Sequence, residues 1–389
     1  MRTTVGIRFV CSAGFFLAAS PLCAQAPEGP LLPGPGSQLQ QPPSGVLNKL
    51  TARVTLVTTP VTVRDQSGVM IHNLDQQDFV ITDNGAPQKI IHFEVGGDPL
   101  SIVVAVETST RIDPMLPELR RLGLLFTEQV MGGEAEAAVI GFDDSVHRLQ
   151  GFTHSHDSVE AAFAGLKTTS AEHRLFDAMS EGVAMLSDRR KPTAENPVPG
   201  RRVLLVVSEA LDAGSESEPG EVLRRAQLQN ITIFSIGLSS IRGELQSKAR
   251  ENAPVPITPP GISTVPGPPG TVNVPPAGGA GGDGIDLIAL AQVIVQQGKS
   301  AQTKRALELG AAATGGSYYS CFKGRSIESA LDEIGGELHS QYMISYSPPG
   351  SDNGQDFGYH KISVALAPEK SQGKKISSRP GYYLPPPSN

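Results

Sequence analysis

Buried strands that alternate with amphipathic helices set the strongest constraint on the fold of this 389-residue chain. Three runs are apolar almost throughout: "LSIVVAVE" (100–107), "RRVLLVVSE" (201–209) and "ITIFSIGL" (231–238). A strand that is apolar on both faces belongs inside a parallel sheet with helices on each side. The pattern predicts an α/β fold with a doubly wound, mostly parallel sheet over residues 98–340. Ligands are then expected beyond the carboxyl ends of its strands.

Alternating strand patterns flank this region on both sides. In residues 48–97, "ARVTLVTTPVTVRDQSG" alternates apolar and polar positions, and "DNG" at 83–85 is a strong hairpin signal. Residues 341–389 return to short strand runs that are separated by turns. We expect a small accessory β module at 48–97, which the strands of 341–389 join in one composite β layer.

The amino terminus is typical of a secretory signal peptide. Arg2 and Arg8 flank the start of an apolar run, and small residues precede a plausible cleavage site after Ala24. The run is shorter than the roughly 20 residues that span a bilayer, and no later apolar stretch is long enough to do so. We expect residues 1–24 to be removed and the mature protein to be exported, either to the periplasm or out of the cell. An uncleaved anchor is the alternative interpretation.

Two segments have compositions that do not support a packed core. Residues 25–47 and 252–284 are rich in Pro and Gly and lack periodic apolar positions. We therefore expect a disordered linker at 25–47 and a disordered insertion at 252–284, within the region assigned to the α/β sheet.

Charge and cysteine content exclude two classes of protein. The formal charge is −7, and it becomes −9 when Arg2 and Arg8 are removed. An acidic chain without a basic run argues against nucleic acid as a partner. Cys321 is the one cysteine after residue 24, so the mature chain cannot form an internal disulfide.

The order of these segments resembles a von Willebrand factor type A domain. The resemblance rests on "SIVVAVETS", "VIGFDDSV", "RLFDAM", "VLLVVSE" and "ITIFSIGL". The flanking runs "DFVITDNGAPQKIIHFE", "SQYMISYSPP", "HKISVAL" and "RPGYY" are similar to the secreted bacterial VWFA-related family of acidobacterial type. This resemblance runs from Thr51 to Leu384. It implies a Rossmann-like type A domain in an exported protein, in a family whose molecular function is largely unassigned.

Type A domains often carry a metal-ion-dependent adhesion site, and the resemblance places its positions in this chain. The family pattern has Asp-x-Ser-x-Ser after the first strand, a Thr before a later helix and an Asp after the fourth strand. Oxygen ligands of these types suit Mg²⁺. The matching positions hold Glu107, Ser109, Arg111, His173 and Glu209, with Asp212 close to the last of them. Only Ser109 keeps the residue type of the family, so the resemblance implies a degenerate site without a cofactor. Any Mg²⁺ or Mn²⁺ would depend on Glu107, Ser109 and Glu209.

Arg111 puts a permanent cation where the family has a neutral ligand. Within about 4 Å of a divalent ion, a guanidinium would be repelled by several kcal/mol even at an effective dielectric constant of about 20. The same group would be attracted to Glu107 and Glu209 and could bond either carboxylate through two N–H groups. Two interpretations stay open. Arg111 either ties two loops together through Glu107 or Glu209, or points into solvent beside an empty site.

The sequence carries no recognisable catalytic motif. G-x-S-x-G and H-E-x-x-H patterns are absent, and a hairpin turn explains the Asp143–Asp144 pair. We expect a non-enzymatic, adhesion-like module that binds an unknown protein partner of the envelope or the extracellular space at the carboxyl edge of the sheet. One alternative is a structural component of the cell envelope. The other is an enzyme that uses a cleft between the β module and the type A domain.

Overall fold

The computed structural model describes residues 56–96, 100–190, 200–238, 300–321, 327–348 and 358–384. All of them belong to one compact unit, Ala52–Asn389. The expected signal peptide (1–24), linker (25–47) and insertion (252–284) lie outside the described residues, as does the start of the expected β module at 48–55.

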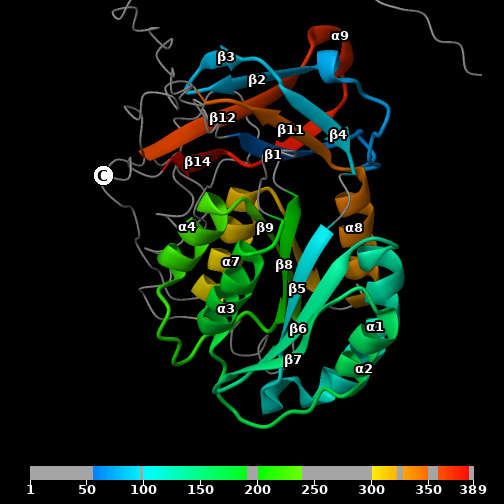
Figure 1. The fold of residues 1–389 in the computed structure, drawn as a ribbon, viewed down its shortest axis with the longest axis vertical. Helices are drawn as coiled ribbons and strands as arrows, with labels where there is room; N and C mark the ends of the chain where they lie inside the picture. The colour runs from blue at the N-terminus through cyan, green and yellow to red at the C-terminus, as the bar shows by residue number, and fades with distance from the viewer. Residues whose placement is uncertain are drawn as a thin grey trace, which may run out of the picture. The chain divides into compact units, whose positions relative to one another are not determined.

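A six-stranded sheet forms the centre of the α/β region (Figure 1). Its strands are β5 (Leu100–Glu107), β6 (Glu136–Phe142), β7 (Val146–Thr153), β8 (Arg201–Ser208), β9 (Ile231–Leu238) and β10 (Tyr318–Cys321). They lie side by side in the order β7-β6-β5-β8-β9-β10, and the edge strand β7 is antiparallel to its neighbour while the other pairs are parallel. Counted along the chain, this is the doubly wound order 3-2-1-4-5-6. The predicted α/β sheet is therefore confirmed, and its topological switch point lies between β5 and β8.

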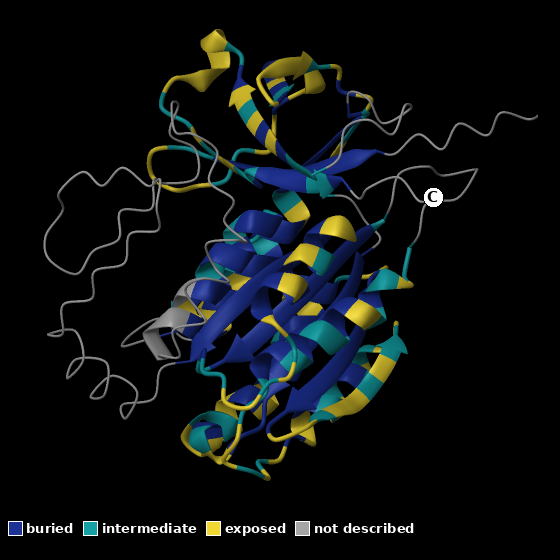
Figure 2. Cartoon of the chain, turned by 90° about the vertical axis from the view of Figure 1, so that its left-hand side faces the viewer, coloured by how far each residue is buried: buried dark blue, intermediate teal, exposed yellow. Residues whose placement is uncertain are grey.

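Helices cover both faces of this sheet, as Figure 1 shows. One face carries α1 (Leu116–Leu125), the π-helical turn η3 (Phe126–Met131), α2 (His156–Ala164) and α8 (Ile327–Ser340). The other face carries α3 (Leu175–Ser187), α4 (Pro219–Leu228) and α7 (Ser300–Thr314). All eight residues of β5 are buried between the two helical layers, which appear around the dark blue strands in Figure 2. A Cβ atom at Gly182 of α3 would lie 2.6 Å from Leu204 Cδ1, so the glycine lets α3 approach β8 without a shift of the Leu204 side chain.

The Asp113-Pro114 pair in the loop after β5 is typical of a helix N-terminus, but it does not start α1. Residues Thr110–Met115 form the 3₁₀ turn η2, and α1 starts at Leu116. The Asp113 side chain does not cap α1; it accepts a hydrogen bond from the Thr168 hydroxyl. The tertiary contact therefore competes successfully with the local cap that Asp-Pro suggests.

Two four-stranded sheets combine strands from the two ends of the described chain. The first has the order β13-β1-β11-β4 and the second β14-β12-β2-β3. Their strands are β1 (Val57–Arg64), β2 (Phe79–Asp83), β3 (Ala86–Gln88), β4 (His92–Val95), β11 (Tyr342–Tyr346), β12 (Gly358–Leu366), β13 (Lys375–Ser378) and β14 (Gly381–Leu384), with the short helices η1 (Gln76–Asp78) and α9 (Pro368–Ser371) between them. The expected hairpin at "DNG" joins β2 to β3, with Asn84 and Gly85 both at positive φ.

The expectation of one composite layer is wrong, because these strands form two sheets. Val61 and Tyr342 of the first sheet share a buried cluster with Ile81 and Tyr382 of the second. A single layer would leave one apolar face in water, whereas two layers bury an apolar face of each sheet. Buried Asp83 also joins the two sheets, because it accepts hydrogen bonds from Tyr346 (2.9 Å) and Tyr382 (2.7 Å).

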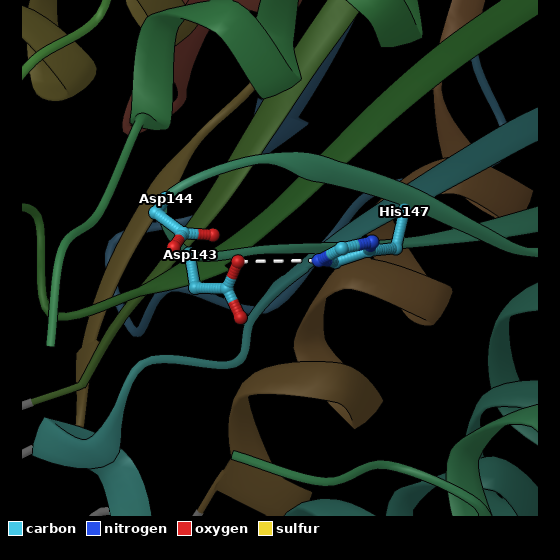
Figure 3. A group of neighbouring side chains, drawn as sticks. All are labelled: Asp143, Asp144 and His147. Atoms are coloured by element: carbon cyan, nitrogen blue, oxygen red, sulfur yellow. Dashed lines mark hydrogen bonds and ion pairs between the residues drawn. The ribbon is translucent and has the colours of Figure 1, made fainter. Parts of the chain in front are cut away.

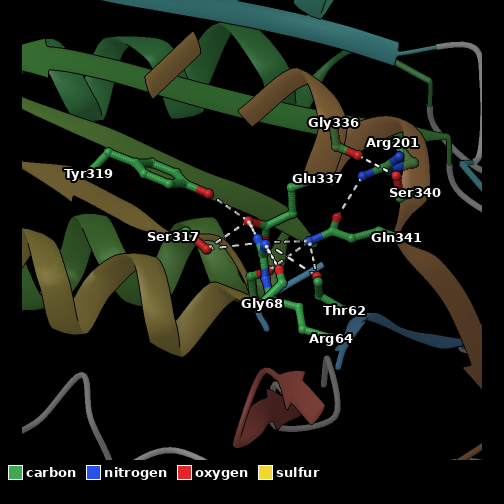
Figure 4. A network of polar contacts seen from close by, with 11 residues as sticks. Thr62, Arg64, Gly68, Arg201, Ser317, Tyr319, Gly336, Glu337, Ser340 and Gln341 are labelled. Atoms are coloured by element: carbon green, nitrogen blue, oxygen red, sulfur yellow. Dashed lines mark hydrogen bonds and ion pairs between the residues drawn. The ribbon is translucent and has the colours of Figure 1, made fainter. Parts of the chain in front are cut away.

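A buried carboxylate connects the first small sheet to the α/β region (Figure 4). Glu337 of α8 is 3% exposed. Its oxygens accept hydrogen bonds from the side chains of Thr62 (3.3 Å), Arg64 (3.4 Å), Ser317 (3.0 Å), Tyr319 (2.9 Å) and Gln341 (3.1 Å). Burial and the Glu337 charge raise the pKa of Tyr319, so this phenol stays a donor at neutral pH. One side chain thus receives donors from β1, from β10 and the residue before it, and from the residue just before β11.

Glu337→Gln is expected to lower the free energy of unfolding by about 3 kcal/mol, because several buried donors lose a charged acceptor. Urea denaturation of the variant measures the loss. Asp332→Asn, an exposed acid on the same helix, is the matched control and should change stability by less than about 0.5 kcal/mol. Equal stability of the two variants would contradict a central role for the buried carboxylate.

Candidate functional site

The candidate site lies where β5 and β8 end, at the switch point of the sheet. Parallel strands deliver their carboxyl ends to one edge, so Glu107 of β5 and Ser208 of β8 meet there. Ligands of doubly wound sheets bind at this position because the chain leaves the two strands toward opposite faces and opens a crevice. The fold therefore brings the loop after Glu107 beside the loop after Ser208.

Glu107 is fully buried, and protein donors satisfy both of its carboxylate oxygens. One oxygen accepts the Ser109 hydroxyl at 2.5 Å. The other accepts the Ser208 hydroxyl and the Glu209 backbone N–H, each at 2.8 Å. Ser109 is also buried, with an exposed fraction of 0%. The first hydroxyl of the degenerate motif is thus directed at the neighbouring carboxylate.

Arg111 makes an ion pair with Glu209 across the two loops. The Nε atom of Arg111 lies 2.8 Å from a carboxylate oxygen of Glu209. The Glu209 side chain is 3% exposed and the Arg111 side chain 32% exposed. Of the two interpretations left open by the sequence, the structure has the tie between the loops, and it runs through Glu209. The second oxygen of Glu209 is buried and has no hydrogen-bond partner among the described residues.

His173 and Asp212 lie in adjoining loops and make hydrogen bonds with other residues. His173 pairs with Ala213 through the backbone, and its carbonyl accepts the Ala213 N–H at 3.0 Å. The Asp212 carboxylate accepts the Ser215 hydroxyl at 2.5 Å and the Phe176 N–H at 3.3 Å, near the start of α3. Glu107, Ser109, Arg111 and Glu209 therefore form one connected group, which these two residues do not enter.

Thr169 and Ser170, which the sequence did not single out, lie against the loop after β5. The Thr169 N–H bonds the Thr108 carbonyl at 3.2 Å, and the Thr110 N–H bonds the Ser170 carbonyl at 2.7 Å. This segment takes the place beside Ser109 that the resemblance assigned to His173. The Ser/Thr-rich run "TTS" at 168–170 is the signal that could have identified it.

Asp143, just after β6, is a further buried carboxylate of this edge (Figure 3). It accepts hydrogen bonds from the hydroxyls of Thr108 (3.4 Å) and Thr169 and contacts His147 Nε2 at 3.2 Å. Burial alone would raise the pKa of Asp143, but the hydrogen bonds from Thr169 and its other donors outweigh burial and lower it. Asp143 therefore holds the 168–170 segment against the loop after β5 as a carboxylate.

Asp143, Asp144 and His147 each offer a ligand atom within 4.8 Å of the others. This spacing suits a metal ion, but Asp144 and His147 are exposed and Asp143 is already bonded to two threonines. The turn between β6 and β7, where the Asp143 N–H bonds the Ser145 carbonyl at 3.0 Å, accounts for the Asp-Asp pair.

The residues at the switch point do not fit a bound divalent cation. Mg²⁺ needs oxygen ligands in a near-octahedral shell. The Glu107 oxygens already accept three donors, and one Glu209 oxygen pairs with the Arg111 guanidinium, which leaves only the other, buried Glu209 oxygen without a partner among the described residues. A cation at Glu209 would have to displace a permanent positive charge from a 2.8 Å contact, which Coulomb repulsion opposes.

Comparisons with known proteins leave the family open. No protein-family model matches the chain, and no curated protein matches it. Among solved structures, it is similar to BatB from Bacteroides thetaiotaomicron, with 12% identity and a TM-score of 0.37 over 62% of this chain and 98% of that one. An aerotolerance-related membrane protein from Bacteroides fragilis gives 13% identity and a TM-score of 0.38 over the same shares. The mussel byssus protein PTMP1, in a structure with a zinc-occupied MIDAS motif, gives 13% and 0.32 over 38% of each chain. These scores are low, so we assign the architecture from the strand order alone.

Asp143→Asn is expected to lower stability at pH 7 by about 1–3 kcal/mol, because buried donors lose a charged acceptor. The pKa of Asp143 is lower in the folded state than its ordinary value, so its contribution is complete above that ordinary value of about 4 and is lost as the pH falls through the folded pKa. Denaturation at pH 7 and pH 3 should therefore show a difference from wild type that shrinks at pH 3. Asp332→Asn, an exposed acid of α8 away from this edge, is the control. A constant difference at both pH values would contradict the lowered pKa.

Proposed function

We propose that this chain is an exported, non-enzymatic protein-interaction module whose binding edge works without a metal ion. The observation that carries the proposal is the Arg111–Glu209 ion pair at the switch point. In an adhesion site of the metal-dependent kind, a divalent cation joins the protein to a carboxylate of the partner. Here a guanidinium holds the cation's place, so the edge keeps a positive group that can bind an acceptor.

The orientation of Arg111 supports such a role. Its Nε atom is bonded to Glu209, while the two terminal nitrogens make no hydrogen bond with the described residues. The side chain is about one-third exposed, so these N–H groups are accessible to a partner. A guanidinium bound to one carboxylate through one edge can bind a second through the other, and a carboxylate is its strongest acceptor.

The charges around Arg111 limit the distance over which it can attract a carboxylate of the partner. Glu107 and Glu209 carry two negative charges against the single positive charge of Arg111. Recognition at this edge then depends on short-range hydrogen bonds to the guanidinium rather than on long-range steering, which needs a field of one sign. The buried contacts of Glu107 and Glu209 keep Arg111 in one orientation before a partner arrives, which lowers the entropic cost of binding.

Export is supported by the amino-terminal pattern of Arg2, Arg8 and an apolar run before Ala24. Among the described residues, no helix is both long and apolar enough to cross a membrane. We place the partner, a protein, in the envelope or the extracellular space.

Calorimetric titration with Mg²⁺ and Mn²⁺ tests metal independence. The wild-type protein is expected to show no micromolar binding. Arg111→Ser should bind Mn²⁺ more tightly than wild type, because it removes a repelling charge and supplies a hydroxyl ligand. Micromolar affinity in the wild type that Ser109→Ala abolishes would overturn the proposal.

Affinity capture from native envelope extracts in EDTA tests the binding edge. The immobilised wild-type protein should retain its partner in EDTA, and Arg111→Ser should weaken retention about tenfold, because a charged hydrogen bond is lost. Arg111→Lys, which keeps the charge without the planar fork, should fall between the two. Arg121→Ser, an exposed arginine of α1, is the control and should bind as wild type does. A partner that is released by EDTA, or is held equally by Arg111→Ser, would contradict this function.

A further inference from the structure

A small cavity lies at the amino edge of the six-stranded sheet, opposite the edge of the candidate site. Its volume is about 20 Å³. Arg202 of β8 and Thr232 of β9 line it from the large sheet, and Thr58 of β1 and Arg379, just before β14, line it from the small sheets. The cavity thus sits among segments that are far apart in the sequence.

Two buried arginines face this cavity without enough acceptors. Arg202 is 5% exposed and Arg379 is 2% exposed. The Nε atom of Arg202 and the Nε and Nη2 atoms of Arg379 are buried and have no hydrogen-bond partner among the described residues. Nη1 of Arg379 donates to Asn230 Oδ1 at 3.1 Å, and Asn230 also lines the cavity. No described carboxylate forms an ion pair with either arginine.

The neighbouring Arg201, by contrast, has hydrogen-bond acceptors at this edge of the sheet. It too is buried, and its guanidinium donates to the Leu338 carbonyl at 2.6 Å and to Gln341 Oε1 at 2.8 Å. Three arginines therefore line the cavity, and of these only Arg202 and Arg379 have buried N–H groups without an acceptor among the described residues.

Both arginines stay charged at neutral pH although they are buried. Burial lowers the pKa of Arg202, and it lowers the pKa of Arg379 to about 10. A buried charge is strongly unfavourable unless an opposite charge or a full set of hydrogen bonds compensates it. Two such charges around one cavity create a positive site that an anion would neutralise.

The size of the cavity selects the class of anion. A site for one water molecule needs about 10–15 Å³, so 20 Å³ accommodates one or two waters or a single monatomic ion. Phosphate and sulfate are larger than this. The candidate ligands are therefore halide ions, of which chloride is the one that is abundant in biological fluids.

We propose that this cavity binds one halide ion, held by the free N–H groups of Arg202 and Arg379. Such an ion would connect β8 of the large sheet to the segment that leads into β14. The site would be structural: its occupation would stabilise the folded chain without touching the edge that carries Arg111.

A crystal of the full chain grown in sodium bromide tests occupancy directly, because bromide scatters anomalously. A bromide peak between the two guanidiniums is expected. A water molecule without anomalous signal, or a carboxylate of another segment in the cavity, would overturn the proposal.

Thermal unfolding in sodium chloride and in sodium gluconate at equal ionic strength gives the second measurement. Once the site is filled, the Tm should rise by roughly 3–5 °C per tenfold increase in chloride, and bulky gluconate should have no such effect. Arg202→Met should abolish the chloride dependence, and Arg121→Met, on the exposed surface, should keep it. If Arg202→Met does not fold, the bromide crystal and the wild-type comparison decide. Equal Tm values in the two salts would contradict a halide site.

Discussion

The architecture depends on one carboxylate inside the protein, that of Glu337. A buried carboxylate is tolerated only where donors surround it, and here the donors come from segments that the sequence separates widely. Thr62 and Glu337 are 275 positions apart, and the hydrogen bond between them joins the first small sheet to the last helix of the α/β region. The contact is directional, so it sets the register of β1 against α8 in a way that apolar packing alone would not. It makes the two regions one folding unit.

At the switch point, too, buried carboxylates are surrounded by donors from the protein. Glu107 takes three donors from its own loop and from the end of β8, and Glu209 takes the Arg111 guanidinium. The protein's own donors satisfy both oxygens of Glu107 and one oxygen of Glu209, while the other Glu209 oxygen is buried without a partner among the described residues.

The sequence was sufficient to predict the features of the fold that depend on the strands alone. Apolar runs predicted the doubly wound sheet, and the resemblance to a type A domain placed Glu107, Ser109, Arg111 and Glu209 at one edge of it. Prediction from the sequence failed for loops whose conformation depends on tertiary contacts. Thr169 rather than His173 lies against the loop after β5, because its backbone bonds Thr108 and its hydroxyl bonds Asp143. The "TTS" run offers such donors but does not say which distant residues accept them. The separation into two small sheets also depends on packing between layers, which a pattern of period two does not reveal. Buried arginines such as Arg379 look, in sequence, like surface residues.

The pairing of strand β1 with strands near the other end of the chain affects how the protein folds. Strand β1 pairs with β11 and β13, so Val57 faces Tyr346 and Arg64 faces Lys375 across almost the whole chain. Strand β1 therefore has no partner until most of the polypeptide has been made, whereas β2 can pair early with β3 along one of its edges. Chains dominated by such non-local pairings fold slowly, because a long loop must close, at an entropic cost, before the stabilising contacts can form. Until then β1 and β2 present unpaired edges that are prone to aggregation, so a newly made chain would benefit from a chaperone that shields them.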